Sequence, residues 1–130
     1  MASIFTQIIQ GEIPSYKLYE DTKTYAFLDL DQRSRGHALV VPKLEVDKLY
    51  DLPDADFQAV MATAKKLSQH FEQVLGRRIF WKVIGTDVPH AHVHLMPYSE
   101  DYDPALVNTP LEIPASEMAA LQAQLKLEDA

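Results

Sequence analysis

The seven residues from His90 to Met96 alternate histidine with apolar side chains, as His-Ala-His-Val-His-Leu-Met. In an extended strand, residues two positions apart point to the same face of a sheet. The segment therefore predicts a strand with three imidazoles on one face and Ala91, Val93 and Leu95 on the other. Imidazole is a poor filler for a sheet face, so three in register indicate a functional site.

Two kinds of chemistry suit this pattern. Alternating histidines on a strand can supply two or three nitrogen ligands to Zn²⁺. Neutral imidazoles can also react directly, because one can attack phosphorus while its neighbours fix its tautomer and protonate the leaving group. The spacing within the segment does not separate these two alternatives.

Composition excludes several classes of protein and several kinds of site. The chain has 130 residues, is 47% hydrophobic and carries a net charge of −7, which is typical of a single domain and unfavourable for nucleic-acid binding. It contains no cysteine, so a disulfide scaffold, a thiolate metal site and a cysteine nucleophile are excluded. We find no targeting segment and no apolar run long enough for a membrane span. We therefore expect a cytoplasmic protein that binds neither membranes nor nucleic acid.

Hydrophobic spacing and turn residues predict the secondary structure. The expected elements, in chain order, are a helix at 3–10 between Ser3 and Gly11, strands at 16–20 and 23–29, a polar loop at 31–36, a strand at 37–41, a short helix at 44–50, a long helix at 54–75, a strand at 79–84, a tight turn at 85–87, a strand at 88–97 and a helix near 115–127.

The helix at 54–75 has the strongest pattern. Its apolar residues follow the three–four spacing of an amphipathic helix, with acidic residues in the first turn and Gly76 after the last. The expected buried stripe is Phe57, Val60, Met61, Ala64, Leu67, Phe71, Val74 and Leu75. Strands outnumber helices and are expected to pair in sequence order. The prediction is an α+β fold with a largely antiparallel sheet of about five strands, one long helix and short helices.

Four separated segments resemble the histidine triad (HIT) family of nucleotide hydrolases and transferases, whose motif alternates histidine with apolar residues. They occur in the family's order and at similar spacing, and are residues 4–14, 25–30, 36–43 and 88–96. The resemblance covers residues 4–97 of a single domain at 1–130 and leaves 98–130 as a C-terminal extension. It implies the family's α+β fold and a homodimer with a sheet continuous across the interface.

The resemblance also implies roles for four histidines. His92 matches the family's nucleophile, and His94 would contact the phosphate or the leaving group. His90 and the remote His37 would orient the triad. The implied reaction is attack at the α-phosphate of an AMP-like phosphoramidate, ester or dinucleoside polyphosphate, followed by hydrolysis of the His92 nucleotidyl intermediate. No cofactor or catalytic metal is implied, and the implied partner is a purine nucleotide.

Six further residues match nucleotide-binding positions of the family. Asp29, with Leu30 beside it, matches the carboxylate that accepts hydrogen bonds from the ribose hydroxyls, a role a carboxylate can fill. A loop-entry aspartate that caps backbone amides is the alternative. The positions matching the base pocket, which could equally be plain core, are Phe5, Ile8, Ile13 and Phe27.

The sequence departs from the family in its zinc ligands. Many bacterial members bind structural zinc with two cysteines, a further histidine and the first triad histidine. The corresponding positions are Ser3, Thr6 and Glu45, and only His90 remains. We therefore expect a zinc-free protein.

The phosphate loop also differs. The family's longer Asn-Gly loop is replaced by Gly85-Thr86-Asp87, whose backbone amides could still hold phosphate. Asp87 places a negative charge near that anion. Arg33 and Arg35 precede Gly36-His37, where they could bind distal phosphates or simply be solvated.

Two other functions stay open. One is a nucleotide-binding protein with weak or no catalysis because of the altered loop. The other is a metalloprotein that uses His90, His92 and His94 with a carboxylate. The fifth histidine, His70, is expected at the surface of the long helix, outside the site.

Overall fold

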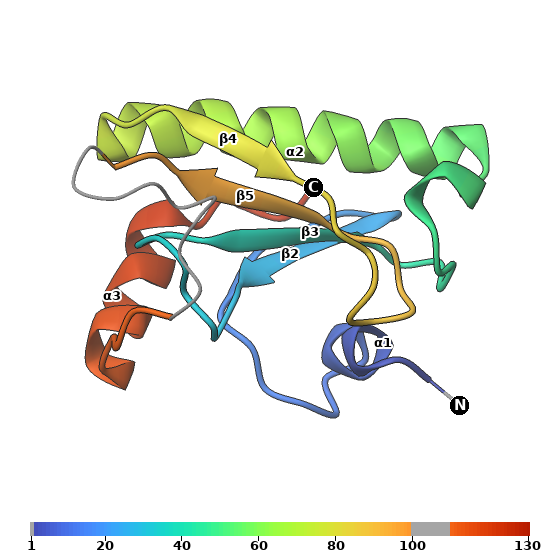
Figure 1. Cartoon of the computed structure of the whole chain (residues 1–130), viewed down its shortest axis with the longest axis horizontal. Helices are drawn as coiled ribbons and strands as arrows, with labels where there is room; N and C mark the ends of the chain where they lie inside the picture. Colours follow the sequence, from blue (N-terminus) through green and yellow to red (C-terminus); the bar gives the residue numbers. More distant parts are fainter. Residues whose placement is uncertain (1, 100–109) are drawn as a thin grey trace.

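The computed structural model describes residues 2–99 and 110–130. The elements that position the site are shown in Figure 1. They are α1 (Ile4–Ile9), β1 (Lys17–Glu20), β2 (Thr24–Leu28), β3 (Ala38–Pro42), the 3₁₀ turn η1 (Leu49–Asp51), α2 (Asp54–Leu75), β4 (Ile79–Lys82), β5 (Val93–Pro97) and α3 (Ala115–Leu125).

The five strands form one antiparallel sheet with the order β1-β2-β3-β5-β4. This confirms the predicted α+β fold. The expectation that all strands pair in sequence order is wrong, because β5 lies between β3 and β4. As a result, the histidine segment enters the middle of the sheet, next to the strand that follows His37.

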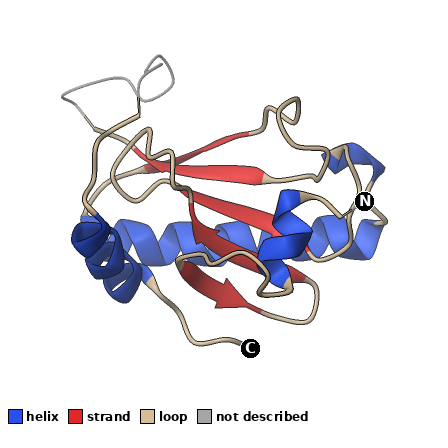
Figure 2. Cartoon of the chain, turned by 90° about the horizontal axis from the view of Figure 1, so that it is seen from below, coloured by secondary structure: helices blue, strands red, loops and turns tan. Residues whose placement is uncertain are grey.

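Each face of the sheet packs against different helices. Val40 and Val93 are cross-strand partners, and both contribute to the core under α2 and α3. Leu39, the partner of His94, belongs to a second core under α1. Figure 2 shows α2 running the length of the sheet. The histidine face is therefore the face that α1 covers.

The two ends of the sheet differ. Beyond α3 the chain returns along β1, where the Leu127 N–H donates to the Leu18 carbonyl and the Ala130 N–H donates to the Glu20 carbonyl. Within the described residues, β4 has no second partner strand. The extension after residue 98 thus packs on the domain with its helix α3, whose position agrees with the predicted helix; residues 100–109 lie outside the described ranges.

The connection from β4 to β5 is longer than predicted. β4 ends at Lys82, and β5 begins only at Val93, so the tight turn at 85–87 and the long strand at 88–97 are wrong. Pro89 has no N–H for a ladder. The Ala91 N–H instead donates to the Val46 carbonyl, which holds this part of the chain away from the strand pairing.

Two smaller predictions also fail. Residues 44–50 form no α-helix, and only the single turn η1 is present. Phe57, placed on the buried stripe of α2, is 38% exposed, whereas Val60, Ala64, Leu67 and Phe71 are fully buried as expected. Phe57 lies in the first turn of α2, before the first fully buried apolar residue of the stripe, Val60. Among the described residues, no helix combines the length and apolarity needed to cross a bilayer.

The turn before β3 requires a glycine. Gly36 has a φ of +99°, and a Cβ at this position would lie 3.1 Å from Cγ of Pro97. Gly76, at the end of α2, also has a positive φ of +65°, but a Cβ there would have no atom within 4 Å.

We predict that Gly36→Ala destabilises the protein more than Gly76→Ala. Both substitutions place a side chain in the left-handed region, at about 1–2 kcal/mol each, and Gly36→Ala adds an overpacking cost of roughly 1–3 kcal/mol. Denaturant unfolding of the two variants measures the difference. Equal losses would contradict the close contact with Pro97.

Candidate active site

Four of the five histidines gather on the α1 face of the sheet and are buried: His37, His90, His92 and His94. The ring centroids of His37 and His94 are 5.1 Å apart, and those of His92 and His94 are 5.0 Å apart. The Phe5 ring of α1 packs edge-on against His90 and His92. The structure thus brings together all four predicted catalytic histidines, while His70 lies half-buried on α2.

Backbone carbonyls determine the tautomers of His90 and His92. Nδ1 of His92 lies 2.8 Å from the His90 carbonyl, and Nε2 of His90 lies 2.7 Å from the Pro42 carbonyl. A carbonyl oxygen only accepts, so both nitrogens must carry hydrogen. The second nitrogen of neutral His90 then accepts from the Ser3 hydroxyl at 2.7 Å. The second nitrogen of neutral His92, Nε2, is a bare lone pair.

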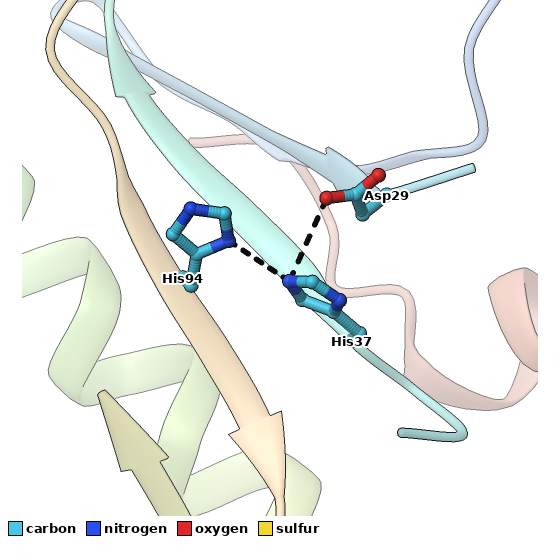
Figure 3. Close-up of side chains that lie close together, drawn as sticks. All are labelled: Asp29, His37 and His94. Carbon is cyan, nitrogen blue, oxygen red and sulfur yellow. Dashed lines mark hydrogen bonds and ion pairs between the residues drawn. The ribbon is translucent and has the colours of Figure 1, made fainter. Parts of the chain in front are cut away.

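A backbone amide determines the other two tautomers. The Arg33 N–H donates to Nδ1 of His37, so the hydrogen of neutral His37 is on Nε2. That nitrogen lies 2.9 Å from Nδ1 of His94 (Figure 3). His37 therefore donates to His94, and the hydrogen of neutral His94 is on Nε2.

These bonds leave two nitrogens of the cluster without a partner. Nε2 of His92 and Nε2 of His94 are buried and make no hydrogen bond. The first is a lone pair and the second is an N–H donor, and their rings are neighbours. Buried polar atoms are normally paired, so an unpaired acceptor beside an unpaired donor indicates a place for a reacting group.

Burial keeps the supporting imidazoles neutral. It lowers the pKa of His37 to about 3, with a further contribution from His94. Burial, followed by the charge of His92, lowers the pKa of His94 to about 4. The pKa of His90 is also lowered, mainly by burial. The tautomers described above for His37, His90 and His94 are therefore the relevant forms at neutral pH.

Asp29 lies at the edge of this cluster. Oδ1 accepts from the Asp31 N–H at 2.8 Å, and Oδ2 lies 3.6 Å from Nε2 of His37. Burial raises the pKa of Asp29 to about 6. The backbone-capping role is thus present, and Oδ2 has no hydrogen-bond donor among the described residues. Leu30 beside it is 74% exposed.

Gln32 is a site residue that the sequence did not reveal. Its side chain is 1% exposed, and its amide donates to the carbonyls of Asp29 and His37. Its Oε1 accepts from the N–H groups of Gly36 and His37. One glutamine therefore fixes both ends of the loop that carries Asp29 and His37. A glutamine in a polar loop gives no pattern from which to predict this.

The expected base-pocket residues come together in the second core. Phe5, Ile8 and Phe27 are buried, and Ile13 packs against them. The rings of Phe5 and Phe27 meet edge to face at a centroid distance of 5.7 Å. The apolar group thus lies beside His92 through Phe5, and it also serves as the core that attaches α1 to the sheet.

The loop between β4 and β5 also reaches the cluster. Gly85 and Thr86 line a cleft of about 220 Å³ whose lining includes His92. The Asp87 carboxylate accepts from the Val88 N–H at 3.1 Å, and the same oxygen lies 3.6 Å from Nε2 of His92. The predicted loop residues are therefore at the site, and the negative charge of Asp87 faces the bare nitrogen.

The positions that replace the family's zinc ligands bind one another. The Ser3 N–H and the Thr6 hydroxyl both donate to Oε1 of Glu45, at 2.6 and 2.7 Å, while the Ser3 hydroxyl donates to His90. The pKa of Glu45 is lowered to about 2, first by the Ser3 N–H and then by the Thr6 hydroxyl. Two hydroxyls, a carboxylate and an already paired imidazole do not match a thiolate zinc site.

The three-histidine metal site is not supported either. Both ring nitrogens of His90 are paired with protein atoms. Among the described residues, the one group of three potential ligands is Asp29, His37 and His94. There the hydrogen bond between His37 and His94 already holds the ligand nitrogens together.

The two loop arginines point to carboxylates. Arg33 forms an ion pair with Asp31 at 2.8 Å, and Arg35 lies 3.5 Å from Glu117 of α3. Neither of these contacts directs a guanidinium toward the triad.

We predict that the protein loses stability as the pH falls from 7 to 4. The pKa values of His37 and His94 lie below those of unfolded histidine, so below pH 6.5 the unfolded chain binds protons that the folded chain does not. For His37 this amounts to about 2 kcal/mol between pH 8 and pH 5. Asp29 acts in the opposite direction, because its raised pKa lets the folded state bind a proton first between pH 6 and pH 4.

Urea unfolding at several pH values measures this effect. His37→Gln should flatten the pH dependence, and Asp29→Asn should steepen it. An unfolding free energy that stays constant between pH 7 and pH 5 would contradict neutral, buried imidazoles.

Comparison with known proteins identifies the family. The HIT domain matches residues 10–101. The chain is 37% identical over 115 residues to adenosine 5'-monophosphoramidase HNT1 of Saccharomyces cerevisiae, covering 85% of this chain and 72% of the yeast protein. It is 31% identical over 103 residues to adenylylsulfatase HINT3 of Arabidopsis thaliana, covering 75% of this chain and 52% of that protein.

A solved structure shows the same fold. The crystal structure of a Hit-like protein from Bartonella henselae superposes with a TM-score of 0.84 at 25% identity, covering 95% of this chain and 93% of that one. Because the domain match spans more than half of the sequence and the yeast relative is above 30% identity, the chain belongs to the histidine triad (HIT) family.

Proposed function

We propose that the protein hydrolyses nucleotides substituted at the α-phosphate, with adenosine 5'-phosphoramidates as its first substrate class. The observation that carries this proposal is the pair of unpartnered nitrogens, with a lone pair on His92 Nε2 next to an N–H on His94 Nε2. A nucleophile beside a proton donor is what displacement at phosphorus requires.

In the first step, Nε2 of His92 attacks the α-phosphorus. An N–P bond forms, the P–N bond to the amine breaks, and the proton on Nε2 of His94 passes to the leaving nitrogen. This transfer leaves His94 as an imidazolate, whose negative charge is balanced by the imidazolium that forms at the neighbouring His92. The positive charge on the nucleotidylated imidazolium of His92 is shared with Nδ1–H, which donates to the His90 carbonyl at 2.8 Å. The backbone thus stabilises the charge that appears in this step.

In the second step, water attacks the nucleotidyl-His92. The proton of the water passes to Nε2 of His94, which is now a base, and the N–P bond breaks. The products are a nucleoside monophosphate, free His92 and His94 in its starting form. His37 holds the same tautomer of His94 through both steps, because its Nδ1 remains bonded to the Arg33 N–H.

The nucleoside end of the substrate fits the same face. Oδ2 of Asp29 is available for ribose hydroxyls, and Phe5 lies between the apolar cluster and the triad. The preference for adenosine and for phosphoramidates rests on the names of the relatives, among which are adenosine 5'-monophosphoramidases from yeasts and an adenylylsulfatase from a plant.

One observation favours a second function, namely nucleotide binding with little turnover. The Asp87 carboxylate lies 3.6 Å from the attacking nitrogen, where it opposes an incoming phosphate. A binding protein would show affinity for AMP and no hydrolysis above the buffer rate. The expected homodimer stays a prediction; β4 is the sheet edge at which a second copy could continue the ladder.

We predict that His92→Ala lowers the hydrolysis of an adenosine 5'-phosphoramidate by at least about 10³-fold, because the nucleophile is lost. AMP binding should persist within a few-fold, since the ribose and base contacts remain. His70→Ala, on the other side of the sheet, is the matched control and should keep full turnover. Steady-state kinetics and calorimetric titration with AMP measure both properties.

Unchanged turnover in His92→Ala would contradict the covalent mechanism. Affinity for AMP without turnover in the unmodified protein would instead favour the binding function.

A further inference from the structure

Lys82 is a cation on the triad face that none of the roles above uses. It is the last residue of β4, and its Cα is paired with that of His94 across the ladder. Directly opposed residues of an antiparallel pair project from the same face, with Cβ atoms about 4.5–5.5 Å apart. Its neighbour Trp81 takes the opposite face, where the indole donates to the Ser68 hydroxyl of α2. Lys82 therefore projects beside His94.

The charge of Lys82 acts on the triad. It is one of the causes that lower the pKa of His94, although a smaller one than burial. Within the described part of the chain, no carboxylate forms an ion pair with Lys82. The loop arginines, by contrast, lie against Asp31 and Glu117.

The site needs such a cation. The chain carries a net charge of −7, and Asp87 places a carboxylate next to the attacking nitrogen. The supporting imidazoles are neutral, so they contribute dipoles to a bound phosphate and no net charge. A partly exposed ammonium group can move to an anion without breaking an existing ion pair.

We propose that Lys82 is the phosphate-binding cation of this site and that it holds the non-bridging oxygens of the α-phosphate beside His94. This inference rests on the proposed function, because it assigns a residue to the phosphate of the same nucleotide. In this arrangement, the positive charge that attracts the phosphate to an acidic protein comes from Lys82 on the edge strand β4. Arg33 and Arg35 are not needed for it.

Asp87 has the opposite effect in this arrangement. Its Oδ1 occupies the Val88 N–H and faces His92, so a phosphate must displace it to reach the same nitrogen. Removing the Lys82 charge should weaken phosphate binding, and removing the Asp87 charge should strengthen it. Two nearby residues thus give changes of opposite sign, which general damage to the site would not produce.

The experiment compares AMP with adenosine, which lacks the phosphate, by calorimetric titration at low ionic strength. Lys82→Gln should weaken AMP binding by about 10-fold or more and leave adenosine binding unchanged. Lys82→Arg should retain most of the AMP affinity, and Asp87→Asn should increase it. Lys65→Gln, which removes an exposed lysine of α2 on the other side of the sheet, should behave like the unmodified protein.

The outcomes separate the two proposals. If the unmodified protein binds AMP and Lys82→Gln binds it equally well, the role of Lys82 is overturned and the proposed function stands. If Lys82→Gln loses AMP and adenosine to the same extent, Lys82 is structural and the inference is again overturned. If the unmodified protein binds no nucleotide, both proposals fail.

The salt dependence of AMP affinity provides a second test, because it compares the slope of affinity against salt rather than the affinity of a single variant. AMP affinity should fall with added salt more steeply in the unmodified protein and in Lys65→Gln than in Lys82→Gln, because Lys82→Gln lacks the cation whose attraction salt screens. Equal salt dependence in Lys82→Gln and Lys65→Gln would overturn the inference.

Discussion

The hydrogen bond from Nδ1 of His92 to the His90 carbonyl is the interaction on which the site depends. It places the lone pair of His92 on Nε2 and leaves a backbone dipole to stabilise the positive charge that forms there. A side-chain partner could titrate or rotate, whereas this carbonyl is fixed by the chain itself. The second fixed point is the Arg33 N–H, which through His37 places a hydrogen on Nε2 of His94.

The strand order of the sheet brings the triad histidines and His37 together. Because β5 enters the sheet beside β3, His94 comes next to the start of the strand that follows His37. Gln32 then fixes the loop between Asp29 and His37 from inside, and α1 closes over the result with Phe5. Hydrogen bonds among Ser3, Thr6 and Glu45 hold the start of α1, and the Ser3 hydroxyl connects it to His90. The segments that carry these groups are α1, the loop before β3, the segment around Glu45 and β5. They are remote in sequence and meet around the imidazoles of His92 and His94.

Most of the histidine cluster could be predicted from sequence, because successive side chains point to opposite faces even where the backbone is not a regular strand. β5 begins only at Val93, yet Ala91 still faces the α2 core while His90 and His92 face α1. Contacts that depend on how the strands pair, or on hydrogen bonds to distant backbone groups, could not be predicted from the sequence. The place of Lys82 beside His94 follows from the register of β4 against β5, and the role of Gln32 follows from four backbone groups that no local pattern reveals. The helix expected at 44–50 does not form, and within this segment the Val46 carbonyl accepts a hydrogen bond from the distant Ala91 N–H.

The protonation sites of the imidazole nitrogens test this arrangement most directly. ¹⁵N NMR of the histidine-labelled protein near pH 7 distinguishes a protonated ring nitrogen from a bare one for each histidine. The geometry predicts hydrogen on Nδ1 of His92 and on Nε2 of His37, His90 and His94. Hydrogen on Nε2 of His92, with Nδ1 bare, would contradict a nucleophile set by the His90 carbonyl.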